Sequence, residues 1–293
     1  MSTFTVVGTF VDTPTLGQLR IRNDHKCIVE DGKIISIGQD IEPVGELFII
    51  PPGAFVCPGF IDLHCHAPQF PNKGIGCDCQ LLEWLEKYTF PEEKKYSDIV
   101  YAKKQYDRVV KEGLSLGTTC CVYFGSVHAE ATKVLMDVCE SNNQKAYVGK
   151  VCMDVRCPVD YRDIDVHNCL KENQSLIDHS RTLESVEYIL TPRFAPICST
   201  EMMLGLGKLS KEHNLMIQSH ISENKGEIAW MSDLYPKKSY TQVYDDHGLL
   251  NAKTLMAHAI YLDDAELDLF KERDARIAHC PTSNYFLKSG ILD

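Results

Sequence analysis

From about residue 53 onward, short apolar runs alternate with stretches of helical apolar spacing. The runs cover 59–63, 118–124, 146–153, 186–191, 216–220, 254–258 and 276–279. Strands that alternate with helices predict a parallel sheet with helical crossovers. A complete TIM-like (β/α)8 barrel has eight strands. We therefore predict an α/β fold of this barrel type that is incomplete, with about seven strands.

The stretch between the first two runs shows the helical periodicity clearly. Its apolar positions share one helical face and are Ile99, Ala102, Tyr106, Val109 and Val110. Gly113 follows at the position of a C-terminal cap, where glycine is common because it tolerates the left-handed conformation. The pattern predicts a crossover helix that ends near Gly113.

The chain before residue 51 has a different pattern, with short β-branched and aromatic runs separated by turns. Residues 5–10 form one such run, and Asp31-Gly32 lies between two others. Asp-Gly in that position is a strong hairpin signal. The pattern changes at Pro51-Pro52-Gly53. We expect an N-terminal β module, half of a β-sandwich, over 1–52 and the barrel domain over 53–293.

Composition narrows the classes of partner. The chain has 293 residues, 44% hydrophobic and 24% charged, with a net charge of −11 and 13 cysteines. Because lysine and arginine are not concentrated anywhere, we expect no nucleic-acid partner. No run approaches the roughly 20 apolar residues that span a bilayer, and no basic segment precedes an apolar one, so we expect neither membrane insertion nor a signal peptide. Scattered cysteines in odd number favour free thiols and a cytoplasmic location.

Histidines mark the ends of four of the seven apolar runs. They are His64 and His66, His220, His258 and His279. The carboxyl ends of barrel strands meet around one mouth. Imidazole is a common zinc ligand. The pattern therefore predicts a metal site at this end of the barrel.

Two of these motifs have a plainer interpretation when each is taken alone. His64 and His66 alternate along a strand and so share a face, as one metal ion requires, but a pair of hydrogen-bonded core histidines would look the same. Glu223 follows His220 by three residues, which suits an acid/base partner of a metal site. A solvated glutamate at a helix N-terminus is the alternative.

Other candidate motifs are weaker evidence for a metal site. Cys77 and Cys79 form a close pair, but no second pair follows at zinc-finger spacing. His128-Ala129-Glu130 matches the H-x-E of another zinc deaminase fold, whose P-C-x-x-C is absent here. We interpret His128 as the start of an exposed helix. The histidines with polar neighbours are predicted to lie at the surface: His25, His167, His179, His213 and His247.

Taken together, the motifs resemble the amidohydrolase superfamily. They are PGFIDLHCH (58–66), HISEN (220–224), MAH (256–258) and AHCPTSN (278–284). Within that superfamily, further segments resemble the guanine deaminase family: 81–91, 148–154, 191–196, 218–225 and 277–284. The start of the chain, 8–22, is most similar to fungal members. The resemblance runs from about residue 8 to the end.

The resemblance implies a site with one zinc ion per chain and a homodimeric assembly. Its implied metal ligands are His64, His66, His220 and His258, the last either binding zinc or holding the bound hydroxide. Its implied catalytic groups are Glu223, which protonates the purine ring, and His258. Its implied substrate-binding residues are His66, Gln69, Arg193, Phe194, His220 and Glu223. His279 and Asn284 belong to the motif of the seventh strand.

The implied reaction is the zinc-dependent hydrolysis of guanine to xanthine and ammonia. Zinc lowers the pKa of bound water to about 7. Arg193 and Gln69 are expected to donate hydrogen bonds to O6 and neighbouring ring atoms, and Phe194 to stack on the ring.

One part of the family pattern is missing. The family takes the proton from water with an aspartate in a Gly-Thr-Asp context, which this sequence does not contain. We therefore expect weak or no activity in this chain. Two alternatives stay open: a sibling aminohydrolase for another nucleobase or nucleoside, and a non-catalytic binding protein with an amidohydrolase fold.

Overall fold

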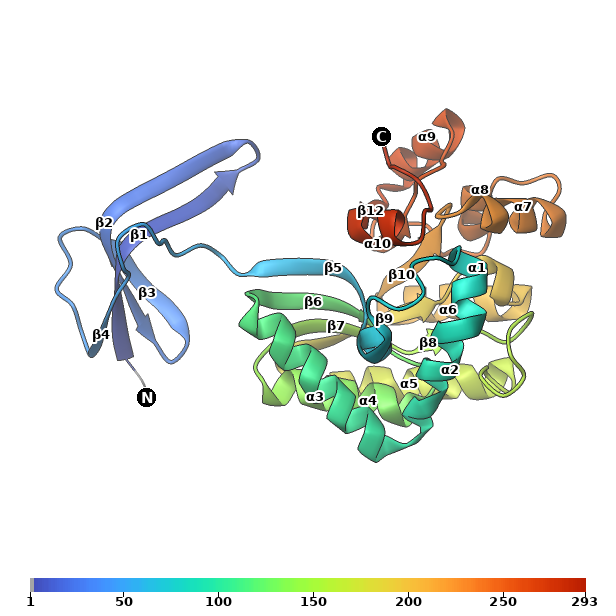
Figure 1. Ribbon diagram of the computed structural model, residues 1–293, viewed down its shortest axis with the longest axis horizontal. Helices are drawn as coiled ribbons and strands as arrows, with labels where there is room; N and C mark the ends of the chain where they lie inside the picture. The colour runs from blue at the N-terminus through green and yellow to red at the C-terminus, as the bar shows by residue number, and fades with distance from the viewer. Residues whose placement is uncertain (1–2) are drawn as a thin grey trace. The chain divides into compact units, whose positions relative to one another are not determined.

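The chain divides into two compact units, Met1–Phe60 and Ile61–Asp293. The computed structural model describes residues 3–293 (Figure 1). Across these residues, none of the helices has the length and apolar character that a membrane crossing requires.

The N-terminal unit is a four-stranded sheet with the order β3-β2-β1-β4. Its strands are β1 (Thr3–Thr15), β2 (Gln18–Glu30), β3 (Lys33–Gly38) and β4 (Glu46–Ile49). β2 pairs antiparallel with both β1 and β3, whereas β4 runs parallel to β1. The predicted hairpin is confirmed. Asp31 and Gly32 have φ values of 50° and 77°, and positive φ at both central positions is the requirement of a type I′ turn.

The strands of the second unit form a nearly closed parallel barrel. They are β5 (Phe60–His66), β6 (Thr118–Phe124), β7 (Lys145–Gly149), β8 (Val151–Cys152), β9 (Val186–Pro192), β10 (Met216–Ile221), β11 (Thr254–His258) and β12 (Arg276–Ala278). The order is β12-β11-β10-β9-β7-β6-β5, with the short β8 paired to β9. The predicted incomplete barrel of about seven strands is confirmed, and β5 and β12 are the end strands of the described sheet.

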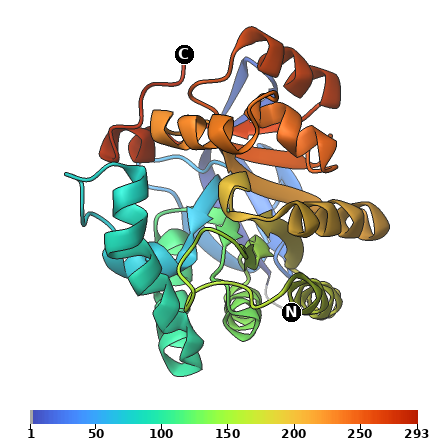
Figure 2. The ribbon, with the colours of Figure 1, turned by 90° about the vertical axis from the view of Figure 1, so that its right-hand side faces the viewer.

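Helices surround these strands (Figure 2). The longer ones are α3 (Ile99–Ser115), α4 (Ala129–Ser141), α5 (Val166–Ser180), α6 (Thr200–His213), α7 (Lys225–Leu234), α8 (Tyr240–Asp246) and α9 (Asp264–Arg273). The short helix η1 (Ala67–Asn72) follows β5. After a loop over 73–80 comes a segmented helix of α1 (Leu81–Trp84), the π-turn η2 (Leu85–Thr89), α2 (Phe90–Glu93) and η3 (Lys94–Ser97). Two short pieces complete the set, η4 (Ala195–Ile197) and α10 (Pro281–Phe286).

α3 shows how well the periodicity predicted a crossover helix. Ala102, Tyr106 and Val110 are fully buried in the main core, between the strands and α3–α6. The predicted end at Gly113 is wrong, because the helix continues to Ser115. Gly113 is not among the residues with positive φ. It therefore continues the helix instead of capping it.

Candidate functional site

A cavity at the carboxyl ends of the barrel strands contains every residue to which the sequence assigned a site role. It is lined by His64, His66, Gln69, Leu81, Trp84, Leu85, Arg193, Phe194, His220, Glu223, Glu227, His258, Ser283 and Leu287. The convergence follows from the topology, because parallel strands deliver their last residues to one mouth.

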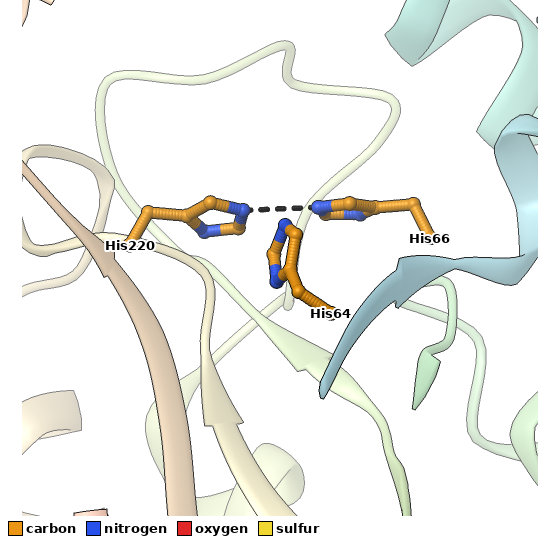
Figure 3. Close-up of side chains that lie close together, drawn as sticks. All are labelled: His64, His66 and His220. Carbon is orange, nitrogen blue, oxygen red and sulfur yellow. Dashed lines mark hydrogen bonds between the residues drawn. The ribbon is translucent and has the colours of Figure 1, made fainter. Parts of the chain in front are cut away.

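Three imidazoles meet within this cavity (Figure 3). His64 and His66 come from the end of β5 and His220 from β10. One ring nitrogen from each lies within 4.8 Å of the others, and Nε2 of His66 is 2.9 Å from Nε2 of His220. The same-face geometry predicted for the H-x-H motif is therefore observed.

The protonation of these rings fits a metal ion. Nδ1 of His220 lies 2.6 Å from the carbonyl oxygen of Arg193, so it donates its proton there and leaves the lone pair of Nε2 facing His66. Nδ1 of His66 is buried without a partner among the described residues. Burial, followed by the neighbouring charges, lowers the pKa of His64, His66 and His220 well below the ordinary value. Three neutral imidazoles with converging nitrogens are a donor set that suits zinc.

His258 ends β11 beside this group. Its Nδ1 lies 2.7 Å from Oδ1 of Asn284, to which it donates, and its Nε2 lies 3.4 Å from Oε2 of Glu223. The φ of His258 is 75°, an uncommon left-handed conformation of the kind found at functional sites. Asn284 of α10 thus fixes the ring so that the lone pair on Nε2 faces the cavity.

Glu223 follows β10 and is only 3% exposed, so the solvated-glutamate alternative is wrong. Burial raises the pKa of Glu223 to about 8. Glu227 of α7 forms a capping box with Asn224 and accepts hydrogen bonds from the backbone N–H groups of Glu223 and Asn224 at 2.9 and 3.3 Å. Glu227 therefore holds the loop that carries Glu223.

Arg193 also lines the cavity and forms an ion pair with Glu93 that the sequence did not predict. Arg193 and Glu93 are 2% and 0% exposed, and Nη1 and Nη2 of Arg193 lie 2.5 and 3.0 Å from the two carboxylate oxygens. Glu93 also accepts from Nε2 of Gln69 and from the hydroxyl of Tyr161, both at 2.8 Å. The ring of Phe90 lies 5.1 Å from the guanidinium carbon. Burial lowers the pKa of Arg193, but Glu93 more than offsets this and the net shift is upward.

We call His64, His66, His220 and His258 the histidine side of the cavity. We call Arg193, Glu93, Gln69 and Tyr161 its arginine side. Phe194 also lines the cavity and packs edge-on against Trp230 with ring centroids 6.1 Å apart. Apolar side chains complete the wall: Leu81, Trp84, Leu85 and Leu287.

Several candidates lie elsewhere or differ from the prediction. His128 does precede α4, but it is half-buried against Tyr161, with ring centroids 5.7 Å apart, and not exposed. His247 is buried rather than at the surface, with its Nδ1 2.6 Å from the carbonyl of Val243. His279 is exposed, and its neighbour Cys280 instead approaches His64 and His258.

A separate group of potential ligand atoms lies in the core, from Cys152, Asp163 and Cys169. The fully buried ammonium of Lys150 already occupies it. Lys150 pairs with Asp163, and its Nζ is 3.8 Å from Sγ of Cys169. A lysine thus neutralises this group, and a metal ion is not needed there.

Comparison with known proteins agrees with this geometry. The model of the amidohydrolase family matches residues 55–293. A probable guanine deaminase of Schizosaccharomyces pombe is 42% identical over 98% of the chain, and a guanine deaminase of Dictyostelium discoideum is 46% identical over 82%. The chain spans only 58% and 54% of these relatives. The crystal structure of guanine deaminase from C. acetobutylicum with bound guanine superposes with a TM-score of 0.94 at 39% identity, covering 99% of this chain and 70% of that one.

Proposed function

The chain belongs to the amidohydrolase family, is related within it to the guanine deaminases, and on this basis we propose that its cavity binds zinc and hydrolyses guanine to xanthine and ammonia. The observation that carries the proposal is the pairing of a neutral three-histidine cluster with a buried carboxyl, Glu223, in one cavity. Hydrolytic deamination needs both an activated water and a proton donor for the ring and the leaving amine.

Each residue of the histidine side has a part in this proposal. His64, His66 and His220 would hold the zinc ion, which when bound supplies water that ionises near neutral pH. Glu223 would transfer a proton to the ring nitrogen beside the carbon under attack, and then help ammonia to leave. His258, oriented by Asn284, would hold the attacking oxygen through the lone pair on its Nε2.

The arginine side would bind the ring. The guanidinium of Arg193 is fixed by Glu93 and lines the cavity, so it can donate to a ring carbonyl without reorganising. Phe194 offers a face for the purine, since its own ring is held by Trp230. The apolar wall around Trp84 would exclude water from the bound ring.

A second function, guanine binding without turnover, is favoured by the small number of carboxylates that line the cavity. Among the described residues these are Glu223 and Glu227, and Glu227 is occupied by backbone N–H groups and Tyr240. Glu223 would then have to take the proton from water as well as give one to the ring. We therefore expect turnover in this chain to be slow.

The test is to load the chain with zinc and follow xanthine formation from guanine. Glu223→Gln should lower the rate by about 10²–10⁴, because an amide cannot transfer the proton. Glu201→Gln, an exposed position in α6, is the matched control and should leave the rate unchanged. Equal rates in the wild type and Glu223→Gln contradict the assigned role. Guanine binding without xanthine establishes the second function instead.

A further inference from the structure

Glu93 lies just behind the cavity wall, and so far only its pairing with Arg193 has entered the proposed chemistry. Its side chain is fully buried, and both oxygens are saturated. Oε1 accepts from Nε2 of Gln69 and Nη2 of Arg193, and Oε2 accepts from Nη1 of Arg193 and the hydroxyl of Tyr161. A carboxylate has about four acceptor positions, so this one is used completely.

The contact with Gln69 decides which end of that amide faces the cavity. A carboxylate only accepts hydrogen bonds, so the atom of Gln69 that touches Glu93 has to be the amide nitrogen. Gln69 lines the cavity, and its Oε1 has no hydrogen-bond partner within the described part of the chain. Gln69 therefore has an acceptor, Oε1, left for a ligand, while one of the two N–H groups of its amide is committed to Glu93.

Arg193 supplies the complementary group. Two of its N–H groups are committed to Glu93, and the guanidinium has five in all. The remaining ones can donate only, since guanidinium carries no acceptor. The wall thus presents a donor from Arg193 beside an acceptor from Gln69.

We infer that Glu93 is a positioning residue that fixes Arg193 and the amide of Gln69 so that the wall recognises the lactam edge of a ring, a carbonyl oxygen next to an N–H. The inference deepens the proposed function and rests on it for the site, but it concerns binding preference and not turnover. A ring with an acceptor nitrogen beside its oxygen would present two acceptors to this wall. Arg193 could donate to one of them, but the other would face the acceptor of Gln69 without a donor.

Two small purines separate these patterns. Hypoxanthine carries the lactam edge, with N1–H beside O6. 6-Methoxypurine carries an acceptor at both positions. Binding can be followed by quenching of tryptophan fluorescence, because Trp84 lines the cavity and Trp230 packs on Phe194. The zinc-loaded wild type should prefer hypoxanthine by about 10- to 100-fold, the range of one hydrogen bond to a charged or buried group.

Glu93→Gln should bring this preference down to about unity, since an amide at position 93 accepts through one atom only and no longer fixes Gln69. The double variant Gln69→Glu/Glu93→Gln should restore the preference. It keeps the total charge beside Arg193, and a carboxylate at position 69 presents an acceptor in either orientation. A purely structural role of Glu93 predicts no such rescue. Glu92→Gln, on the same helix and hydrogen-bonded to Tyr101, is the control and should behave as the wild type.

Gln69→Leu tests the same point without touching the ion pair, and it serves where Glu93→Gln fails to fold by circular dichroism. It should also abolish the preference. The inference is overturned by a wild type that binds neither purine or both equally. It is also overturned by a preference that survives in Gln69→Leu or in folded Glu93→Gln, or by one that the double variant does not regain. A wild type that prefers hypoxanthine but forms no xanthine from guanine overturns the proposed function alone.

Discussion

The two sides of the cavity differ in how far the protein satisfies them by itself. On the arginine side, each oxygen of Glu93 has two donors, and Arg193 is paired through two N–H groups. On the histidine side, Nε2 atoms of His66 and His220 face each other at 2.9 Å, and Nδ1 of His66 has no partner in the described chain. The arginine side is thus part of the folded structure, whereas the histidine side needs a ligand.

The strongest test of this difference is to break the arginine side in metal-free protein. Glu93→Ala should lower the free energy of unfolding by about 3–5 kcal/mol, because it leaves the buried charge of Arg193 unpaired. Denaturant unfolding followed by tryptophan fluorescence measures this in the barrel unit, which contains both tryptophans, Trp84 and Trp230. His66→Ala under the same conditions should have a much smaller effect. Equal losses in the two variants would remove the distinction.

Adding zinc should make the histidine side contribute to stability as well. At free zinc a hundredfold above its dissociation constant, the wild type should gain about 2.7 kcal/mol against unfolding. His66→Ala should lose this gain, since it removes one of three ligands. His167→Ala, an exposed histidine of α5, is the matched control and should keep it. A gain that persists in His66→Ala would place the ion elsewhere.

A smaller effect, a pH dependence of the free energy of unfolding, should come from Glu227, which lines the cavity. Burial, followed by the charge of Glu223, raises the pKa of Glu227 from its ordinary value of 4.5 to about 7. The folded protein therefore holds this proton more tightly than the unfolded chain. The stabilisation is fully present below about pH 4.5 and is lost as the pH rises through about 7.

Glu227→Gln resembles the protonated form and should lack this pH dependence. In metal-free protein it should match the wild type at pH 5 and exceed it at pH 8 by on the order of 2 kcal/mol. Unfolding midpoints at the two pH values measure the difference, and the exposed Glu130→Gln controls for loss of charge alone. A wild type that keeps the same margin below Glu227→Gln at both pH values would show that Glu227 does not titrate in this range.

The histidine side could be predicted from sequence because the fold itself brings it together. A parallel barrel delivers the last residues of its strands to one mouth, so His64, His220 and His258 needed only to be recognised as strand ends. The periodicity of α3 was sufficient for the same reason: burial of one face is a local property. The periodicity was not sufficient to predict where α3 ends, because a glycine such as Gly113 is equally compatible with a helix interior when packing favours it.

Glu93 could not be found in this way. It is separated by 100 residues in sequence from Arg193, and no local pattern links the two. The π-turn Leu85–Thr89 also changes the phase of its helix. An uninterrupted α-helix would place Glu92, two turns after Leu85, on the face of Leu85, whereas the wider turn brings Glu93 there. A helical period read from the sequence therefore indicates the wrong glutamate.

The hydrogen bond between His220 and residue 193 has a consequence for engineering. The acceptor is the main-chain carbonyl of Arg193, so any amino acid at this position still offers it, while the side chain lines the cavity. Libraries that vary positions 193 and 93 together, so that neither charge is left buried alone, can therefore change the lining of the cavity and keep the imidazole of His220 in place. Position 284 offers no such freedom, because there the side-chain oxygen of Asn284 itself orients His258.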